Sequence, residues 1–120
     1  MLAACLLLLP TISTPLRGRE RPKPPDYALI FGTVWSPDDQ PVYGIRVKIR
    51  RATEKKPRWE VYSNHRGEFE QRVPVGKMDY ILWADTKGLK LPRGKHLESP
   101  EVTVHIESNE RADTGLHLKW

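Results

Sequence analysis

Apolar residues recur at every second position from Tyr27 onward, and this period of two limits the fold more than any other feature of the chain. The clearest case is Ile45, Val47 and Ile49, which alternate with three basic residues. Such alternation is typical of a β-strand with one buried and one solvated face. No segment shows a convincing helical period of about 3.6 residues, so we expect almost no helix.

Turn residues divide this region into short runs at regular spacing, which predicts an all-β fold. We expect an antiparallel, immunoglobulin-like β-sandwich of about seven strands, with the core between its two sheets. Hairpins are expected around residues 64–67 and over 102–118, and a long loop over 86–100, which holds two prolines and two glycines. The residues expected to fill the core include Val47, Ile49, Phe69, Tyr80 and Leu82.

The first 26 residues lack this alternation, and we expect them to lie outside the folded domain, which spans 27–120. Residues 1–14 contain an apolar run closed by Pro10 and resemble a secretory signal peptide, whereas residues 15–26 are rich in Pro and Arg and predict an extended linker. The run is shorter than the ~20 residues of a transmembrane span. No Lys or Arg precedes Leu2, so we expect the true start to lie upstream. The domain is therefore expected to be exported to the periplasm, the cell surface or the medium.

The single cysteine, Cys5, lies within this apolar run. Leu2-Ala3-Ala4-Cys5 resembles the lipobox of bacterial lipoproteins, in which the cysteine is acylated. A lipobox should close the apolar region, but four leucines follow Cys5. We therefore favour an ordinary cysteine inside a cleaved signal, and we expect the domain to be stable through packing without a disulfide.

The formal net charge of +5 is distributed unevenly along the chain. Before Pro24 there are four basic residues and one acidic residue, a net of +3, and from Pro24 onward there are 16 basic and 14 acidic residues, a net of +2. The folded part is nearly balanced, which argues against a nucleic-acid partner.

Four motifs follow one another with regular spacing: Gly32-Thr33-Val34 with residues 40–47, Ser63 to Phe69, Val73 to Leu82, and Val102 to Leu118. In residues and spacing, these motifs resemble those of the carboxypeptidase regulatory-like domain. The chain departs from the family in Ser63-Asn64, where Thr-Asp is usual, and in its longer 86–100 loop. The resemblance implies a prealbumin-like sandwich of the kind found beside carboxypeptidase catalytic domains and in bacterial envelope proteins, where it assists folding, spacing or attachment.

Residues that could carry chemistry do not form a recognisable constellation. None of the four histidines falls in a zinc motif, although His105 and His117 are expected close together on the outer face of the last hairpin. Asp38-Asp39 fits a turn better than a calcium loop. There is no nucleophile elbow, and the pair Glu68 and Glu70 is expected on a wet surface. We therefore expect no catalytic residue, no cofactor and no metal ion.

Two surface features are candidates for binding. Arg46, Lys48 and Arg50 form an outward basic row that could attract an anionic polymer, although a solvated face that discourages edge-to-edge aggregation is the favoured interpretation. The aromatic side chains of Phe31, Trp35 and Trp83 are also expected to point outward, where they could stack on sugars or dock a protein, unless the tail or the 86–100 loop covers them.

The leading hypothesis is a non-catalytic exported accessory module that mediates protein contacts at the cell envelope. The alternative is a carbohydrate-binding module of the same β-sandwich class that takes polysaccharide, with Trp35 and Trp83 as stacking residues and the basic stripe 46–58 as support. A weaker alternative is a peptidase-associated regulatory domain. The sequence leaves the partner and the oligomeric state open.

Overall fold

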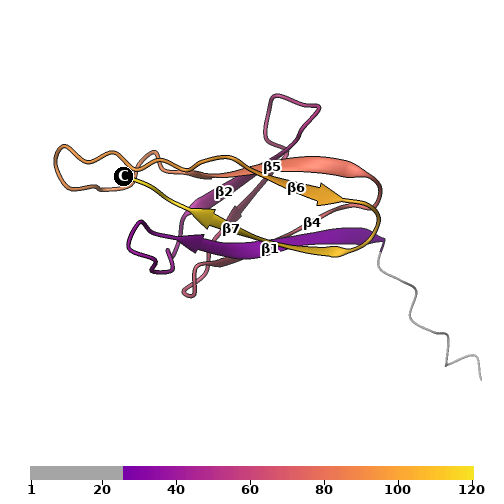
Figure 1. Ribbon diagram of the computed structural model, residues 1–120, viewed down its shortest axis with the longest axis horizontal. Coiled ribbons are helices and arrows are strands. Elements are labelled where there is room, and N and C mark those ends of the chain that lie inside the picture. The colour runs from indigo at the N-terminus through magenta and orange to yellow at the C-terminus, as the bar shows by residue number, and fades with distance from the viewer. Residues whose placement is uncertain (1–25) are drawn as a thin grey trace, which may run out of the picture.

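The computed structural model describes residues 26–120, and these form seven strands and no helix (Figure 1). The strands are β1 (Tyr27–Trp35), β2 (Arg46–Arg51), β3 (Trp59–Tyr62), β4 (Glu68–Pro74), β5 (Met78–Asp85), β6 (Val102–Ile106) and β7 (Arg111–His117). The segment resembling a signal peptide, Cys5 and most of the expected linker lie outside the described residues. Within 26–120, no helix is long and apolar enough to cross a membrane.

The strands form two sheets that pack face to face, so the all-β sandwich is confirmed. One sheet has the order β4-β1-β7 and the other the order β3-β2-β5-β6. Four of the five pairs are antiparallel, as expected, but β1 and β7 run parallel. This pair arises because β7 follows β6 of the other sheet through a tight turn, which fixes its direction before it reaches the free edge of β1.

The two expected hairpins are wrong as paired units, although the turns exist. Asn64 to Gly67 connects β3 to β4, but these strands belong to different sheets. Residues 107–110 likewise connect β6 to β7 across the sandwich. Alternation and turn residues indicate where a chain reverses, but they do not show whether the next strand pairs with the last one or crosses to the facing sheet.

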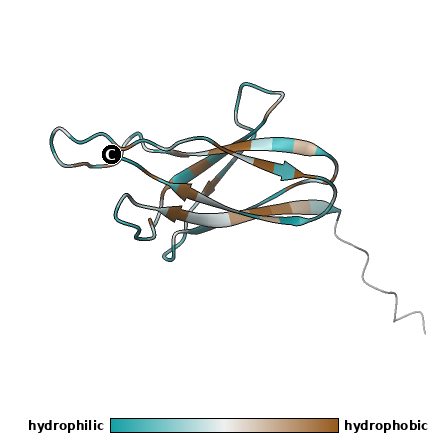
Figure 2. Ribbon diagram, viewed as in Figure 1, coloured by the Kyte–Doolittle hydropathy of each residue, from teal (hydrophilic) through white to brown (hydrophobic). Residues whose placement is uncertain are grey.

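The core lies between the sheets and is built from the inward row of each strand, and Figure 2 shows the apolar and polar bands alternating along the ribbons. All five residues predicted to fill it are buried. Tyr80 is 1% exposed, and its ring meets that of Trp59 edge to face at 5.7 Å. At roughly 1.5–3 kcal/mol for each large apolar side chain, burial of this row supplies the main stabilising term.

The turn after β3 shows why Ser63-Asn64 can replace the usual Thr-Asp of the resemblance. The buried Ser63 hydroxyl donates a hydrogen bond to the Val42 carbonyl (2.6 Å) and accepts one from the Ile45 N–H (3.0 Å). The Asn64 side-chain oxygen accepts hydrogen bonds from the N–H groups of Arg66 and Glu68, both at 2.9 Å. A hydroxyl followed by a side-chain oxygen that accepts hydrogen bonds is what this turn needs, and both residue pairs provide it.

Gly32 allows the close approach at the centre of the three-stranded sheet. A Cβ at this position would lie 1.9 Å from the Thr114 carbonyl oxygen and 3.2 Å from the ring of Phe69. Neither neighbour can move away freely, because one is the backbone of β7 and the other is a core side chain. The spacing of all three strands therefore depends on the absence of a side chain at residue 32.

We predict that Gly32→Ala lowers the free energy of unfolding by about 2–3 kcal/mol, because the added methyl group overpacks the β1–β7 contact. Gly115→Ala is the matched control, since its Cβ would meet mainly the flexible His117 side chain, at 3.3 Å, and it should cost much less. Denaturant unfolding of both variants measures the difference. Equal losses would contradict this account of Gly32.

Candidate functional site

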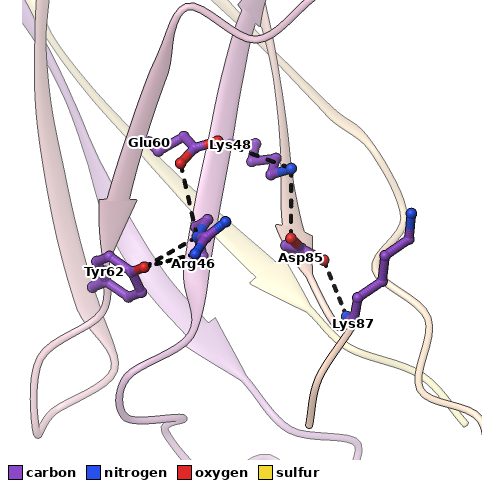
Figure 3. A network of polar contacts seen from close by, with 6 residues as sticks. All are labelled: Arg46, Lys48, Glu60, Tyr62, Asp85 and Lys87. Atoms are coloured by element: carbon purple, nitrogen blue, oxygen red, sulfur yellow. Dashed lines mark hydrogen bonds and ion pairs between the residues drawn. The ribbon is translucent and has the colours of Figure 1, made fainter.

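The outer face of the four-stranded sheet carries the predicted basic row, but carboxylates from neighbouring strands neutralise it (Figure 3). Lys48 lies between Glu60 at 3.9 Å and Asp85 at 3.5 Å. Arg46 donates two hydrogen bonds to the Tyr62 hydroxyl, at 2.9 and 3.1 Å, and lies 3.8 Å from Glu60. The pKa of Asp85 is lowered, first by a hydrogen bond from the backbone N–H of residue 87 and then by Lys48.

The three other arginines of the basic stripe are paired in the same way, whereas Lys55 and Lys56 form no ion pair among residues 26–120. Arg50 lies 3.8 Å from Glu101, and Arg58 forms a hydrogen-bonded ion pair with Glu54 at 2.8 Å. The face is therefore of mixed charge and lacks the single-sign field that captures an anionic polymer. The sequence could not show this, because the neutralising side chains Glu60, Asp85 and Glu101 come from other strands or from the segment before β6.

Trp83 borders a shallow groove of about 660 Å³ at one end of this face. The groove is completed by the end of the 86–100 loop and by lysines, including Lys87 and Lys119. The loop is held in place by an antiparallel bridge between Glu98 and Lys119, with hydrogen bonds of 2.7 and 2.8 Å. Ser99 also accepts a hydrogen bond from the Ala84 N–H at 2.8 Å. Trp83 is therefore half-buried beside the groove.

Trp35 and Trp83 do not form a shared stacking platform. Both point away from the core, as predicted, but Trp35 belongs to β1 of one sheet and Trp83 to β5 of the other. Their side chains therefore lie on opposite outer faces of the sandwich. Trp35 instead stacks on the His117 ring, with centroids 6.4 Å apart.

The outer face of the three-stranded sheet has an apolar centre, and we call it the β1 face. Its middle row is the outward side of β1, namely Tyr27, Leu29, Phe31, Thr33 and Trp35, all of them half-buried. The guanidinium of Arg72 lies 4.5 Å from the centre of the Tyr27 ring, and that of Arg111 lies 5.5 Å from the Phe31 ring. These contacts place cations against aromatic rings rather than against carboxylates.

Strand register arranges four of the charges that border this row into two rungs, and a fifth, Glu68 of β4, lies opposite Thr33. Phe31 lies between Glu70 of β4 and Asp113 of β7, which makes an acidic rung. The adjacent outward residue, Leu29, lies between Arg72 and Arg111, which makes a basic rung. Within the described part of the chain, none of these four charged side chains forms an ion pair. This face therefore differs sharply from the paired surface of the opposite sheet.

The histidines are not brought together, which corrects the expected proximity of His105 and His117. His105 lies on β6 of the four-stranded sheet and His117 on β7 of the other. The His105 ring nitrogens are hydrogen-bonded to Asp79 and Glu107 on its two sides. Hydrogen bonds to Glu107 and then to Asp79 raise the pKa of His105. Among residues 26–120, no group of three or more His, Cys, Asp or Glu side chains is placed to hold a metal ion.

The structure shows the surroundings of the serine and the acidic residues that were considered above for catalysis or calcium binding. The Ser63 hydroxyl is buried, and both of its hydrogen bonds go to the backbone. Glu68 and Glu70 are exposed on β4 and line an open hollow of about 700 Å³, in which charged residues such as Arg111 lie beside Phe31. Asp39 closes a tight turn in which its N–H donates to the Ser36 carbonyl at 2.9 Å, so this loop has the turn structure predicted for it.

Comparison with known proteins shows the fold class. No protein-family model and no curated protein sequence matches the chain. A DUF3823 family protein from Parabacteroides merdae has a similar structure, with a TM-score of 0.56 and 14% identity over 78% of this chain and 46% of that one. The N-terminal domain of the shaft pilin SpaA from Lactobacillus rhamnosus GG gives 0.53 and 12%, over 78% and 93%. The 5-hydroxyisourate hydrolase of Klebsiella pneumoniae gives 0.52 and 16%, over 75% and 90%.

At these identities the likeness concerns the fold alone, which is a prealbumin-like β-sandwich. The chain spans less than half the length of the Parabacteroides protein.

We predict that His105 stabilises the domain only in its protonated form. Because the folded-state pKa is raised, the contribution is fully present below the ordinary histidine pKa of about 6.5 and is lost as the pH rises through the folded-state value. His105→Gln should therefore lower Tm at acidic pH, and the gap should close at alkaline pH. In a background of Asp79→Asn and Glu107→Gln, the same substitution should leave no pH-dependent gap. A gap that persists there would contradict the role given to the carboxylates.

Proposed function

We propose that this chain is an exported, non-catalytic accessory module of the carboxypeptidase regulatory-like type, which mediates protein contacts at the cell envelope through its β1 face. The observation that carries the proposal is the apolar row of β1 bordered by unpaired charges. A shaft pilin with the same fold supports a structural role, and the signal-like residues 2–9 support export.

The contrast between the two outer faces supports the choice of surface. On the four-stranded sheet, the three basic residues of the outward row each have a carboxylate within 4 Å, so the charge of this row is neutralised. On the β1 face, two arginines and three carboxylates have no ion-pair partner among residues 26–120. Aromatic and arginine side chains are enriched at the centre of protein interfaces.

The shape of the β1 face favours a protein partner over a small ligand. The surface is one side of a sheet, with its aromatic residues in a single row along the central strand and an open hollow of about 700 Å³ beside Phe31. A facing sheet of comparable size can contact this whole row, and its own charges can pair with the two rungs. The expected partner is therefore a protein surface with an apolar strip bordered by charges of both signs.

Site-specific photo-cross-linking in the producing cell tests this proposal. A photoreactive residue in place of Thr33, in the middle row of the β1 face, should give covalent protein adducts. The matched control is the same residue in place of Thr103, which points outward from β6 on the opposite sheet. Adducts from Thr33 that are no more abundant than those from Thr103 would refute the proposed surface.

The groove beside Trp83 supports a second candidate function, the binding of acidic polysaccharide. An indole at the edge of a groove can stack on a sugar ring. Lys87 and Lys119 border the same groove and form no ion pair within the described region, so they remain available for a sugar carboxylate.

For this candidate we predict calorimetrically measurable binding of polygalacturonate, but not of a neutral dextran. Trp83→Ala should weaken the binding at least tenfold, which corresponds to about 1.4 kcal/mol. Trp35→Ala, on the opposite face, is the control and should bind as wild type does. Equal binding by the two variants, or none by the wild type, would eliminate the groove as a sugar site.

A further inference from the structure

The pattern of charges on the β1 face is complementary to itself, and from it we infer that the partner is a second copy of this chain, packed face to face about a two-fold axis. This inference rests on the proposed function of the β1 face and names its partner. Glu70 of one protomer pairs with Arg72 of the other, and Asp113 pairs with Arg111.

The register of the sheet supplies the geometry. The acidic rung at Phe31 and the basic rung at Leu29 are adjacent outward positions, separated only by the inward Ile30. A two-fold axis that lies between the sheets, perpendicular to the strands and over Ile30, exchanges these two rungs. Each acidic rung then faces the basic rung of the other copy.

The apolar row is also matched by this axis. Phe31 of one copy faces Leu29 of the other, and Thr33 faces Tyr27, so the centre of the interface is apolar and its borders are charged. Facing sheets pack about 10 Å apart with strand directions within about 30° of each other. Glu and Arg side chains that extend from the two sheets together span this gap.

The other in-plane axis, parallel to the strands, produces the opposite result. It places each rung opposite the same rung of the other copy, so Glu70 faces Asp113 and Arg72 faces Arg111. Like charges placed opposite each other disfavour this arrangement. The charge pattern therefore selects one of the two face-to-face dimers.

The cation–π contacts are compatible with the dimer. Arg72 and Arg111 already lie against aromatic rings of their own protomer, at 4.5 and 5.5 Å. A carboxylate of the second copy can pair with each guanidinium without drawing it away from its ring. Arginine suits this double role, because its planar group stacks through its face and donates hydrogen bonds along its edge.

The size of the face indicates a weak dimer. Three strands about 4.8 Å apart, with a rise of about 3.3 Å per residue, bury roughly 500 Å² on each protomer. The total of about 1,000 Å² is at the low end for specific interfaces. Association should therefore require high protein concentration, and added salt should weaken it, because its bordering ion pairs are partly screened.

Charge reversal tests this arrangement. Glu70→Arg with Asp113→Arg makes both rungs basic, and Arg72→Glu with Arg111→Glu makes both rungs acidic. All four side chains are exposed, so both variants should fold. By sedimentation analysis we expect wild type to dimerise with rising concentration, each variant alone to stay monomeric, and an equimolar mixture of the two variants to regain the dimer.

The matched control is Lys55→Glu with Lys56→Glu, which changes the net charge by the same amount as the acidic variant but at exposed positions outside the β1 face. This control should dimerise as wild type does. A wild type that stays monomeric at every concentration, or a mixture that associates no better than its components, overturns the inference. If Thr33 then still cross-links a different protein in the cell, the proposed function stands and only the identity of the partner is wrong.

Discussion

The position of β1 between β4 and β7 is the constraint on which most of this structure depends. Its inward residues Ile30 and Val34 are fully buried in the core, whereas its outward residues form the middle row of the β1 face. One strand therefore supplies both the packing that holds the sheets together and the surface proposed for function. Gly32 permits this arrangement, because a side chain there would collide with the backbone of β7.

The outward charges are paired on the four-stranded sheet and unpaired on the three-stranded sheet, and the number of strands explains part of this difference. The four-stranded sheet places Lys48 on an inner strand, where β3 on one side and β5 on the other each provide a carboxylate. In the three-stranded sheet, the inner strand is apolar on its outer side, and the charges lie on the two edge strands. On each edge strand a carboxylate and an arginine are adjacent outward residues, but Arg72 and Arg111 lie against aromatic rings of β1 and form no ion pair with these carboxylates among residues 26–120.

The sequence alone predicted the strands, the core residues and the outward direction of Phe31, Trp35 and Trp83, because all of these follow from the period of two within one strand. Strand neighbours depend on contacts between distant segments, which the alternation does not encode. The hairpin predicted over 102–118 failed for this reason, and with it the expected approach of His105 and His117. The ion pair between Lys48 and Asp85 could not be predicted from the sequence either, because the two residues become neighbours only when β2 and β5 align.

The candidate surface required the same long-range information. Arg72 and Arg111 are 39 residues apart in the chain, and they meet in one rung only because both align with Leu29. The parallel pairing of β7 with β1 decides this alignment, and it is the feature that an all-antiparallel expectation could not supply. A shift of one residue in either register would turn these charged side chains toward the core, where burying an unpaired charge is very costly. Burial of the inward rows therefore also fixes the pattern of charges on the outward rows. The complementarity of the β1 face is in this sense a consequence of core packing, since the same register that buries Ile30 and Leu116 sets acid beside acid and base beside base on the outside.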